Sequence, residues 1–223
     1  PTAEMVWVSI SNVLSWAVRF GYLDNNPLTG VKPKFKLNAR RRFLSIEELA
    51  SLWRAAECLS ATQKSAFRML MLLPLRKQEL LLSGWQNVDR QWLLVPGERT
   101  KNHEESALFM SDFAFSVLQA PANEIDLLFT ANNRTPLTLG TKISVKLTEE
   151  SGVSGWVYHD FRRTFSTQMN ERGHPFHIIE ACLSHRDPPR RGVAGAHNRA
   201  EYRTAKQTVL QTWSDLVEAA IGH

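Results

Sequence analysis

The sequence has few cysteines and no long hydrophobic run, and each shortage argues against a class of protein. Its 223 residues include two cysteines, Cys58 and Cys182, which are too few for a disulfide framework and indicate a reducing compartment. The longest apolar run, residues 69–75, is interrupted by Arg76 and Lys77. It is far shorter than the roughly 18 residues that a membrane-spanning helix needs. With 43% hydrophobic and 22% charged residues, the composition is that of a globular protein rather than a disordered or fibrous one.

The chain begins at Pro1 and shows neither an initiator methionine nor a signal-peptide pattern, so we expect a piece of a longer protein. Its length allows one large domain, or one domain together with part of another. A net charge of +5 and a pI of about 9.4 favour a polyanionic partner such as nucleic acid.

A helix and a basic segment precede the region that we expect to fold as a compact domain. Apolar residues at helical spacing predict a helix over residues 7–20, and residues 25–27 predict a turn after it. Residues 31–42 contain no acidic residue. They form either a solvated linker or a linker that lies along a phosphate backbone, where each neutralised phosphate releases counterions. The cations of this segment are Lys32, Lys34, Lys36, Arg40, Arg41 and Arg42.

A compact domain is predicted from Ser45 onward. Ser45 and Glu48 have the spacing of a helix capping box. Residues 67–75 predict an apolar helix that ends next to Arg76, and Pro74 is expected to distort the end of that helix.

Two short β-prone runs, residues 92–95 and 107–110, predict a β-hairpin. From residue 112 onward most apolar spacing is helical, with loops expected at residues 131–136 and 187–195. The predicted fold class is therefore α+β, mostly helical, with a small antiparallel sheet.

Several charged residues could carry chemistry, although each has a simpler structural explanation. On a helix, His159 and Arg162 share a face, but a surface pair of this kind is usually only solvated. Glu79, three residues after Arg76, either neutralises that arginine or orients its guanidinium toward a phosphate. Lys101, at the predicted hairpin tip, either aids solubility or protonates a leaving oxygen.

The order of these residues, together with His185, resembles the tyrosine recombinases, in particular the phage and genomic-island integrases. The resemblance covers roughly residues 45–222. The motifs that carry it are residues 96–102, 159–164, 183–185 and 198–202. It implies the DNA breaking-rejoining catalytic fold over residues 43–223. It also implies that residues 1–30 are the end of the core-binding, DNA-clamping domain and that residues 31–42 are a basic linker.

The resemblance implies that a tyrosine attacks a DNA phosphodiester and leaves a 3′-phosphotyrosine and a free 5′-hydroxyl. Arg76 and Arg162 would neutralise the transition state, and Glu79 would support Arg76. Lys101 would protonate the leaving oxygen, His159 would handle the proton of the nucleophile, and His185 would hydrogen-bond the phosphate. No metal, ATP or other cofactor is implied.

The position expected to hold the nucleophilic tyrosine contains His197. Tyr202 is an alternative, but on one helix it would be rotated by about 500° and displaced by about 7.5 Å from His197. A histidine nucleophile that forms a phosphoramidate is a further alternative. In the remaining alternative, engineered or natural replacement of the tyrosine leaves a chain that binds DNA without completing cleavage.

The resemblance also implies partners and a location. These are double-stranded DNA attachment sites, a tetramer on DNA in the full-length protein, accessory DNA-bending or directionality proteins, and the nucleoid in the bacterial cytoplasm. The function would be integration or excision of mobile DNA. A helix predicted over residues 204–221 is either exchanged between neighbouring subunits or packed on its own domain.

Three rival interpretations remain from the sequence. In the first, the chain is a plain DNA-binding module, with Arg190, Arg191 and the basic linker as phosphate contacts. In the second, it is a type IB topoisomerase-like enzyme, because that class is similar in the chemistry of its active site. In the third, a zinc site is formed by His174, His177, Cys182 and His185.

Overall fold

The contacts in the chain divide it into two compact units, residues 1–41 and residues 42–223. Each unit is described by itself. The structure is a computed structural model that describes residues 2–31, 40–100, 103–118, 126–132, 134–184 and 202–222.

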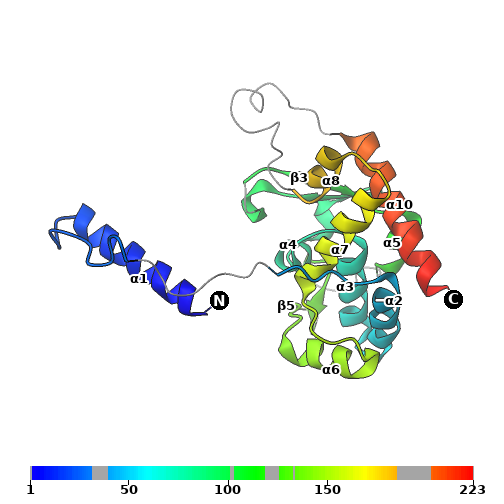
Figure 1. Ribbon diagram of the computed structural model, residues 1–223. Helices are drawn as coiled ribbons and strands as arrows, with labels where there is room; N and C mark the ends of the chain where they lie inside the picture. The colour runs from blue at the N-terminus through cyan, green and yellow to red at the C-terminus, as the bar shows by residue number, and fades with distance from the viewer. Residues whose placement is uncertain are drawn as a thin grey trace. The chain divides into compact units, whose positions relative to one another are not determined.

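Within residues 2–31, the structure of the first unit shows one helix and the turn that follows it (Figure 1). Helix α1 (Thr2–Arg19) confirms the predicted helix and begins earlier than expected. Asn26 holds the following turn against the helix, since its side-chain amide donates to Ser15 Oγ at 2.8 Å. The ring of Trp16 stacks on Tyr22 with a centroid separation of 5.4 Å. Apolar side chains of α1, such as Val13, remain exposed within this unit.

The second unit is mainly helical, as predicted. Its first two helices begin at capping boxes, Ser45 with Glu48 and Ser60 with Gln63, because each serine accepts a main-chain N–H from the first helical turn. The helices are α2 (Ile46–Ala55), α3 (Ala61–Leu72), α4 (Lys77–Leu81), α5 (Asp112–Val117), α6 (Thr141–Ser151), α7 (Tyr158–Glu171), α8 (Phe176–Cys182) and α10 (Arg203–Ile221). Short 3₁₀ turns form at η1 (Ala56–Cys58), η2 (Trp85–Asn87) and η3 (Gly97–Arg99).

A three-stranded antiparallel sheet lies at one side of these helices. Its strands, in the order β1-β2-β3, are β1 (Val88–Asp89), β2 (Trp92–Val95) and β3 (Ser106–Phe109). Strands β2 and β3 form the predicted hairpin, with Trp92 opposite Phe109. The prediction of a loop at residues 131–136 is wrong in part. Strands β4 (Thr130–Ala131) and β5 (Thr135–Pro136) pair there as a two-stranded ribbon.

Helix α10 packs on its own domain and contributes to the hydrophobic core of the second unit. Helix α10 contacts α2, α8 and β3, and it runs alongside these elements in Figure 1. Trp213 of α10 is fully buried, donates its indole N–H to the carbonyl of Met71 at 3.0 Å, and meets Phe165 edge to face. This arrangement matches the second of the two interpretations of the C-terminal helix. No helix among the described residues has the length and apolar character needed to cross a membrane.

Pro74 determines where α3 ends. A residue that precedes proline is pushed out of the helical region, and Leu73 accordingly has extended backbone angles of φ −109° and ψ 125°. The helix therefore ends at Leu72 and does not continue to residue 75 as predicted. The short extended segment after it places Arg76 at the N-cap of α4.

Candidate active site

Arg76 is fixed by a carboxylate that lies beneath it. Oε2 of Glu79 accepts the main-chain N–H of Arg76 at 2.8 Å, and Oε1 accepts its guanidinium N–H at 2.6 Å. The Glu79 side chain is 2% exposed, whereas that of Arg76 is 28% exposed. The buried carboxylate therefore both neutralises the arginine and holds its outer face toward solvent, so the two interpretations of Glu79 describe one arrangement.

Asp160 sets the start of α7, which carries the other two candidate residues. This carboxylate is fully buried, accepts the main-chain N–H of Val157 at 2.9 Å, and pairs with Arg163 at 2.7 Å. The hydroxyl of Thr164 donates to the Asp160 carbonyl and accepts the main-chain N–H of Leu44, both at 2.8 Å. These bonds fix the rotation of the helix and with it the directions of the side chains three residues apart.

Arg162 connects three segments of the chain. Its guanidinium donates to the carbonyl of Pro74, before α4, and to the carbonyl of Leu183, after α8, at 2.6 Å for the second bond. Burial, followed by the nearby charge of Arg76, lowers the pKa of Arg162 to about 10. The group therefore stays charged near neutral pH, in a place where a bound anion would offset the cost of burying it.

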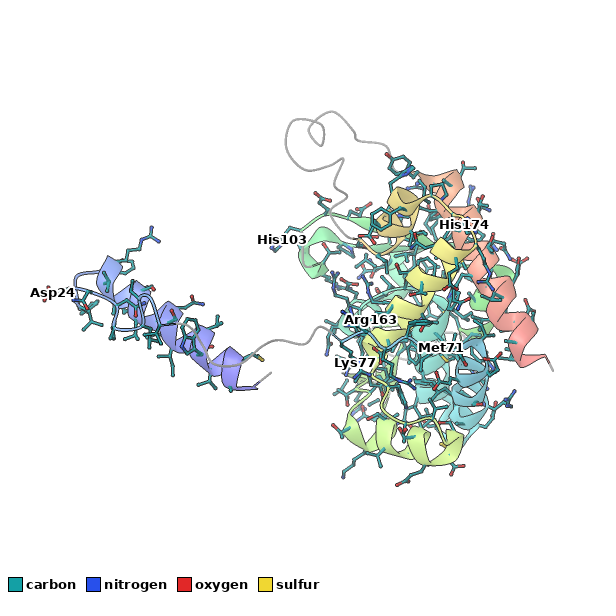
Figure 2. The ribbon with its side chains drawn as sticks, in the orientation of Figure 1. Asp24, Met71, Lys77, His103, Arg163 and His174 are labelled. Atoms are coloured by element: carbon teal, nitrogen blue, oxygen red, sulfur yellow. The ribbon has the colours of Figure 1, made fainter. Side chains whose placement is uncertain are left out.

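Arg76, His159 and Arg162 come together at one pocket of about 410 Å³. No carboxylate lines it among the described residues, because Glu79 lies behind Arg76. Lys77 lies close to the start of α7 in Figure 2, below Arg163. A pocket lined by three cations and an imidazole favours an anion such as a phosphate. The lining residues are Leu75, Arg76, Lys77, Gln78, Val157, Tyr158, His159 and Arg162.

His159 is kept neutral by its surroundings. Partial burial, and then the charges of Arg162, Arg163 and Arg76, lower the pKa of its imidazole below the usual 6.5. Asp160 opposes this shift more weakly. An imidazole that is neutral near pH 7 can accept a proton, which is what activation of a hydroxyl nucleophile requires.

The imidazole of His159 is expected to titrate below pH 6.5 in the free chain and at a higher pH when a phosphate occupies the pocket. A bound anion offsets the charges of Arg76 and Arg162, so the protonated imidazole becomes less unfavourable. By linkage, phosphate binding should strengthen as the pH falls through this pKa. NMR titration of the histidine ring signals between about pH 5 and 8, with and without dimethyl phosphate, a diester whose single charge is constant over this range, measures both values. An unchanged pKa with phosphate bound would contradict this placement of the anion.

The profile described as the phage integrase family matches residues 42–190 of the chain. The chain belongs to the phage integrase family. The prophage integrase IntA of Escherichia coli K12 is 26% identical to it over 231 residues, which cover 98% of this chain and 55% of that protein. The integrase of Shigella phage Sf6 is 24% identical over 222 residues, which cover 94% of this chain and 57% of that protein. The chain thus spans about half the length of the curated relatives it matches.

Solved structures show the same fold. A lambda integrase (residues 75–356) dimer bound to a COC′ core site superposes with a TM-score of 0.66 at 19% identity, covering 83% of this chain and 72% of that one. XerA recombinase superposes with a TM-score of 0.57 at 19% identity, covering 92% of this chain and 76% of that one. The tyrosine-recombinase catalytic fold expected from the sequence is thus confirmed.

Tyr202, the alternative nucleophile of this phage integrase family member, does not line the pocket. It is the N-cap of α10, with a φ of 52°, and its ring lies 5.5 Å from that of His177 on α8. Figure 1 shows the ends of α8 and α10 beside each other, away from the start of α7. In this arrangement Tyr202 is not among the residues that line the pocket with Arg76 and Arg162.

Of the predicted DNA-binding cations, Arg42 is bonded within its own domain. Its guanidinium donates to Glu48 at 2.7 Å and to the carbonyl of Ser154 at 3.0 Å. Arg40 and Arg41 are described as part of the first unit. The other predicted site residues lie outside the described residues; they are Lys32, Lys34, Lys36, Lys101, His185, Arg190, Arg191 and His197.

Glycine is required in the hairpin motif that precedes Lys101. A Cβ on Gly97 would lie 2.7 Å from the main-chain oxygen of His103, closer than such atoms approach each other. The Thr100 hydroxyl lies within hydrogen-bond distance of the carbonyls of Gly97, at 3.0 Å, and Glu104, at 2.8 Å, and they share its single proton. The motif that carries the family resemblance is thus, in part, a requirement of the backbone.

The zinc alternative draws little support from the residues that the structure describes. No group of three potential ligands of the His, Cys, Asp or Glu type gathers among them. Burial raises the pKa of the Cys182 thiol to about 12, which opposes the thiolate that zinc binds.

Two residues of the site escaped the sequence reasoning. Asp160 anchors the start of α7, and Lys77 lines the pocket beside Arg76. Asp160 stands at the third position of α7, where an acidic side chain can accept the main-chain N–H of the N-cap residue. The signal for Lys77 was its place directly after Arg76.

Proposed function

We propose that this chain is the catalytic part of a site-specific tyrosine recombinase that cuts and rejoins DNA through a 3′-phosphotyrosyl intermediate. The observation that carries the proposal is the pocket in which Arg76, His159 and Arg162 converge from α4 and α7. Its charge and its proton acceptor suit a phosphodiester, and family membership supplies the reaction class.

In the proposed reaction the scissile phosphate occupies this pocket. The nucleophile's oxygen forms a bond to phosphorus while the bond to the 5′-oxygen breaks, and the proton of the nucleophile passes to His159. Arg76 and Arg162 stabilise the charge on the non-bridging oxygens. Lys101 donates a proton to the leaving 5′-oxygen, and His185 hydrogen-bonds the phosphate. The reverse attack by a 5′-hydroxyl rejoins the strand.

We infer that the nucleophile is the residue this chain lacks. The position expected for it holds His197. Packing of Tyr202 against His177 supports the interpretation that Tyr202 does not take its place. The scaffold would then bind the phosphate and organise the transition state without completing cleavage.

The proposed substrates are double-stranded attachment sites, recombined during integration or excision of mobile DNA. The lambda integrase relatives bound to a core site and, as a tetramer, to a Holliday junction support DNA binding and assembly on DNA in the full-length protein. Accessory DNA-bending or directionality proteins and a cytoplasmic, nucleoid-associated location belong to the same proposal. So does the division into part of a DNA-clamping domain (residues 1–30), a basic linker (31–42) and a catalytic domain (43–223).

A covalent-trapping assay tests the proposal. A nicked duplex carrying the attachment site, cloned from the flanks of the encoding element, is incubated with the full-length gene product. A covalent adduct is expected with His197→Tyr and not with the unaltered protein, because only the variant carries a hydroxyl at that position. Denaturing gel electrophoresis of labelled DNA measures the adduct.

Tyr202→Phe is the matched control for the trapping assay. An adduct with the unaltered protein that disappears in Tyr202→Phe would make Tyr202 the nucleophile. If none of the proteins forms an adduct although each binds the duplex, the rival DNA-binding module is favoured. A type IB topoisomerase-like activity would instead relax supercoiled plasmid without recombining it.

A further inference from the structure

We propose that Lys77 binds a DNA phosphate in the active-site pocket, next to the phosphate that Arg76 and Arg162 hold. The inference rests on the proposed function and adds a residue that the sequence did not single out. Lys77 lines the same pocket as the two arginines and His159.

The side chain of Lys77 is held in place at the wall of the pocket. Its Nζ donates to the carbonyl of Leu139 at 3.0 Å and lies 4.8 Å from the ring centroid of Tyr158. Tyr158 is in turn packed edge to face against Phe67 and Trp156. A lysine on a surface usually samples many rotamers, so a position fixed by a carbonyl and an aromatic face lowers the entropic cost of holding a ligand.

Lys77 also differs from neighbouring cations in its charge balance. Arg76 has the carboxylate of Glu79, and Arg163 has that of Asp160. Among the residues that the structure describes, no carboxylate lies within ion-pair distance of Lys77. An ammonium has three N–H donors, and the Leu139 carbonyl accepts one of them.

The two arginines suit the single charge of the scissile phosphate. A third cation in the same pocket, without a carboxylate of its own, is balanced when a second anion is present. A DNA strand supplies one charged phosphate per nucleotide, so the phosphate that neighbours the scissile one is the anion available. Lys77 would thereby both balance the charge of this second phosphate and fix the position of the strand.

The salt dependence of DNA binding distinguishes a lysine that contacts a phosphate from one that only supports the wall of the pocket. We would measure binding of a fluorescein-labelled duplex of arbitrary sequence to the full-length gene product by anisotropy between about 50 and 200 mM salt. Lys77→Met is expected to make the slope of log K against log salt shallower by about 0.9. Over this fourfold range its affinity should then fall roughly 3.5-fold less than that of the unaltered chain. Lys77→Arg should restore the slope because it keeps the charge.

Lys146→Met is the matched control. Nζ of Lys146 also donates to a main-chain carbonyl, that of Cys58 at 2.6 Å, but Lys146 lies on α6 outside the pocket. Lys146→Met should leave the slope of log K against log salt unchanged. Lys77→Gln provides a second uncharged variant that keeps a donor for Leu139, and thermal melting shows whether each variant folds.

Two outcomes would overturn the inference, and they are distinguishable. If the unaltered chain binds with a salt-dependent affinity and both folded, uncharged Lys77 variants keep its slope, Lys77 does not contact a phosphate and only the inference fails. If the unaltered full-length protein shows no salt-dependent binding, the proposed function fails as well. A shallower slope in Lys77→Met and Lys77→Gln, with the slope kept in Lys146→Met, supports the inference.

Discussion

Replacing Arg162 with lysine in a His197→Tyr protein is expected to slow DNA strand cleavage by about 100- to 1,000-fold. The guanidinium is buried and is bonded to the carbonyls of Pro74 and Leu183. A lysine keeps a positive charge but cannot span both carbonyls and a phosphate oxygen with one planar fork. Single-turnover trapping on a nicked attachment-site duplex measures the rate.

Arg163→Lys is the matched control, because Arg163 is the next residue on α7 and pairs with Asp160 outside the pocket. It should keep a cleavage rate within a few-fold of the parent protein. Binding of intact duplex by Arg162→Lys should also remain close to that of the parent, since one phosphate contact is altered rather than lost. Equal loss of cleavage in both variants would show that the rate reports the stability of α7 instead of charge stabilisation at the phosphate.

Features set by local chemistry were predictable from the sequence. The capping box at Ser45 and Glu48 and the hairpin formed by β2 and β3 depend on residues close together in the chain, and both appear as expected. The ribbon of β4 and β5 was missed because two strands of two residues give no alternating pattern to detect. The early end of α3 was missed because the apolar run continued beyond the residue that Pro74 forces out of the helix.

The candidate site was predictable to the extent that helical spacing and family motifs place residues. His159 and Arg162 share a face of α7, and Glu79 reaches Arg76 across one turn of α4. The bonds from Arg162 to Pro74 and Leu183 join segments far apart in sequence, so periodicity gives no sign of them. Arg42 has a partner that its place in a basic run does not predict, because its guanidinium pairs with Glu48 of α2.

Trp213→Ala is expected to lower the free energy of unfolding of the second unit by about 3 to 5 kcal/mol. The indole is fully buried between α3 and α7, so its removal leaves a cavity and also leaves the Met71 carbonyl without its donor. Such a loss is a large share of the about 5 to 15 kcal/mol that stabilises a typical domain. Urea unfolding followed by far-UV circular dichroism measures it.

Two further variants separate the loss of buried area from the loss of the hydrogen bond to Met71. Trp213→Phe keeps most of the buried area but loses the bond to Met71, so a smaller loss of about 1 to 3 kcal/mol is expected. Trp16→Ala, at an exposed position of the first unit, should leave the unfolding of the second unit unchanged. Because α10 packs on its own domain, the effect of Trp213→Ala should not depend on protein concentration. An effect that grows on dilution would mean that α10 is exchanged between subunits and that its packing in this structure is not the packing in solution.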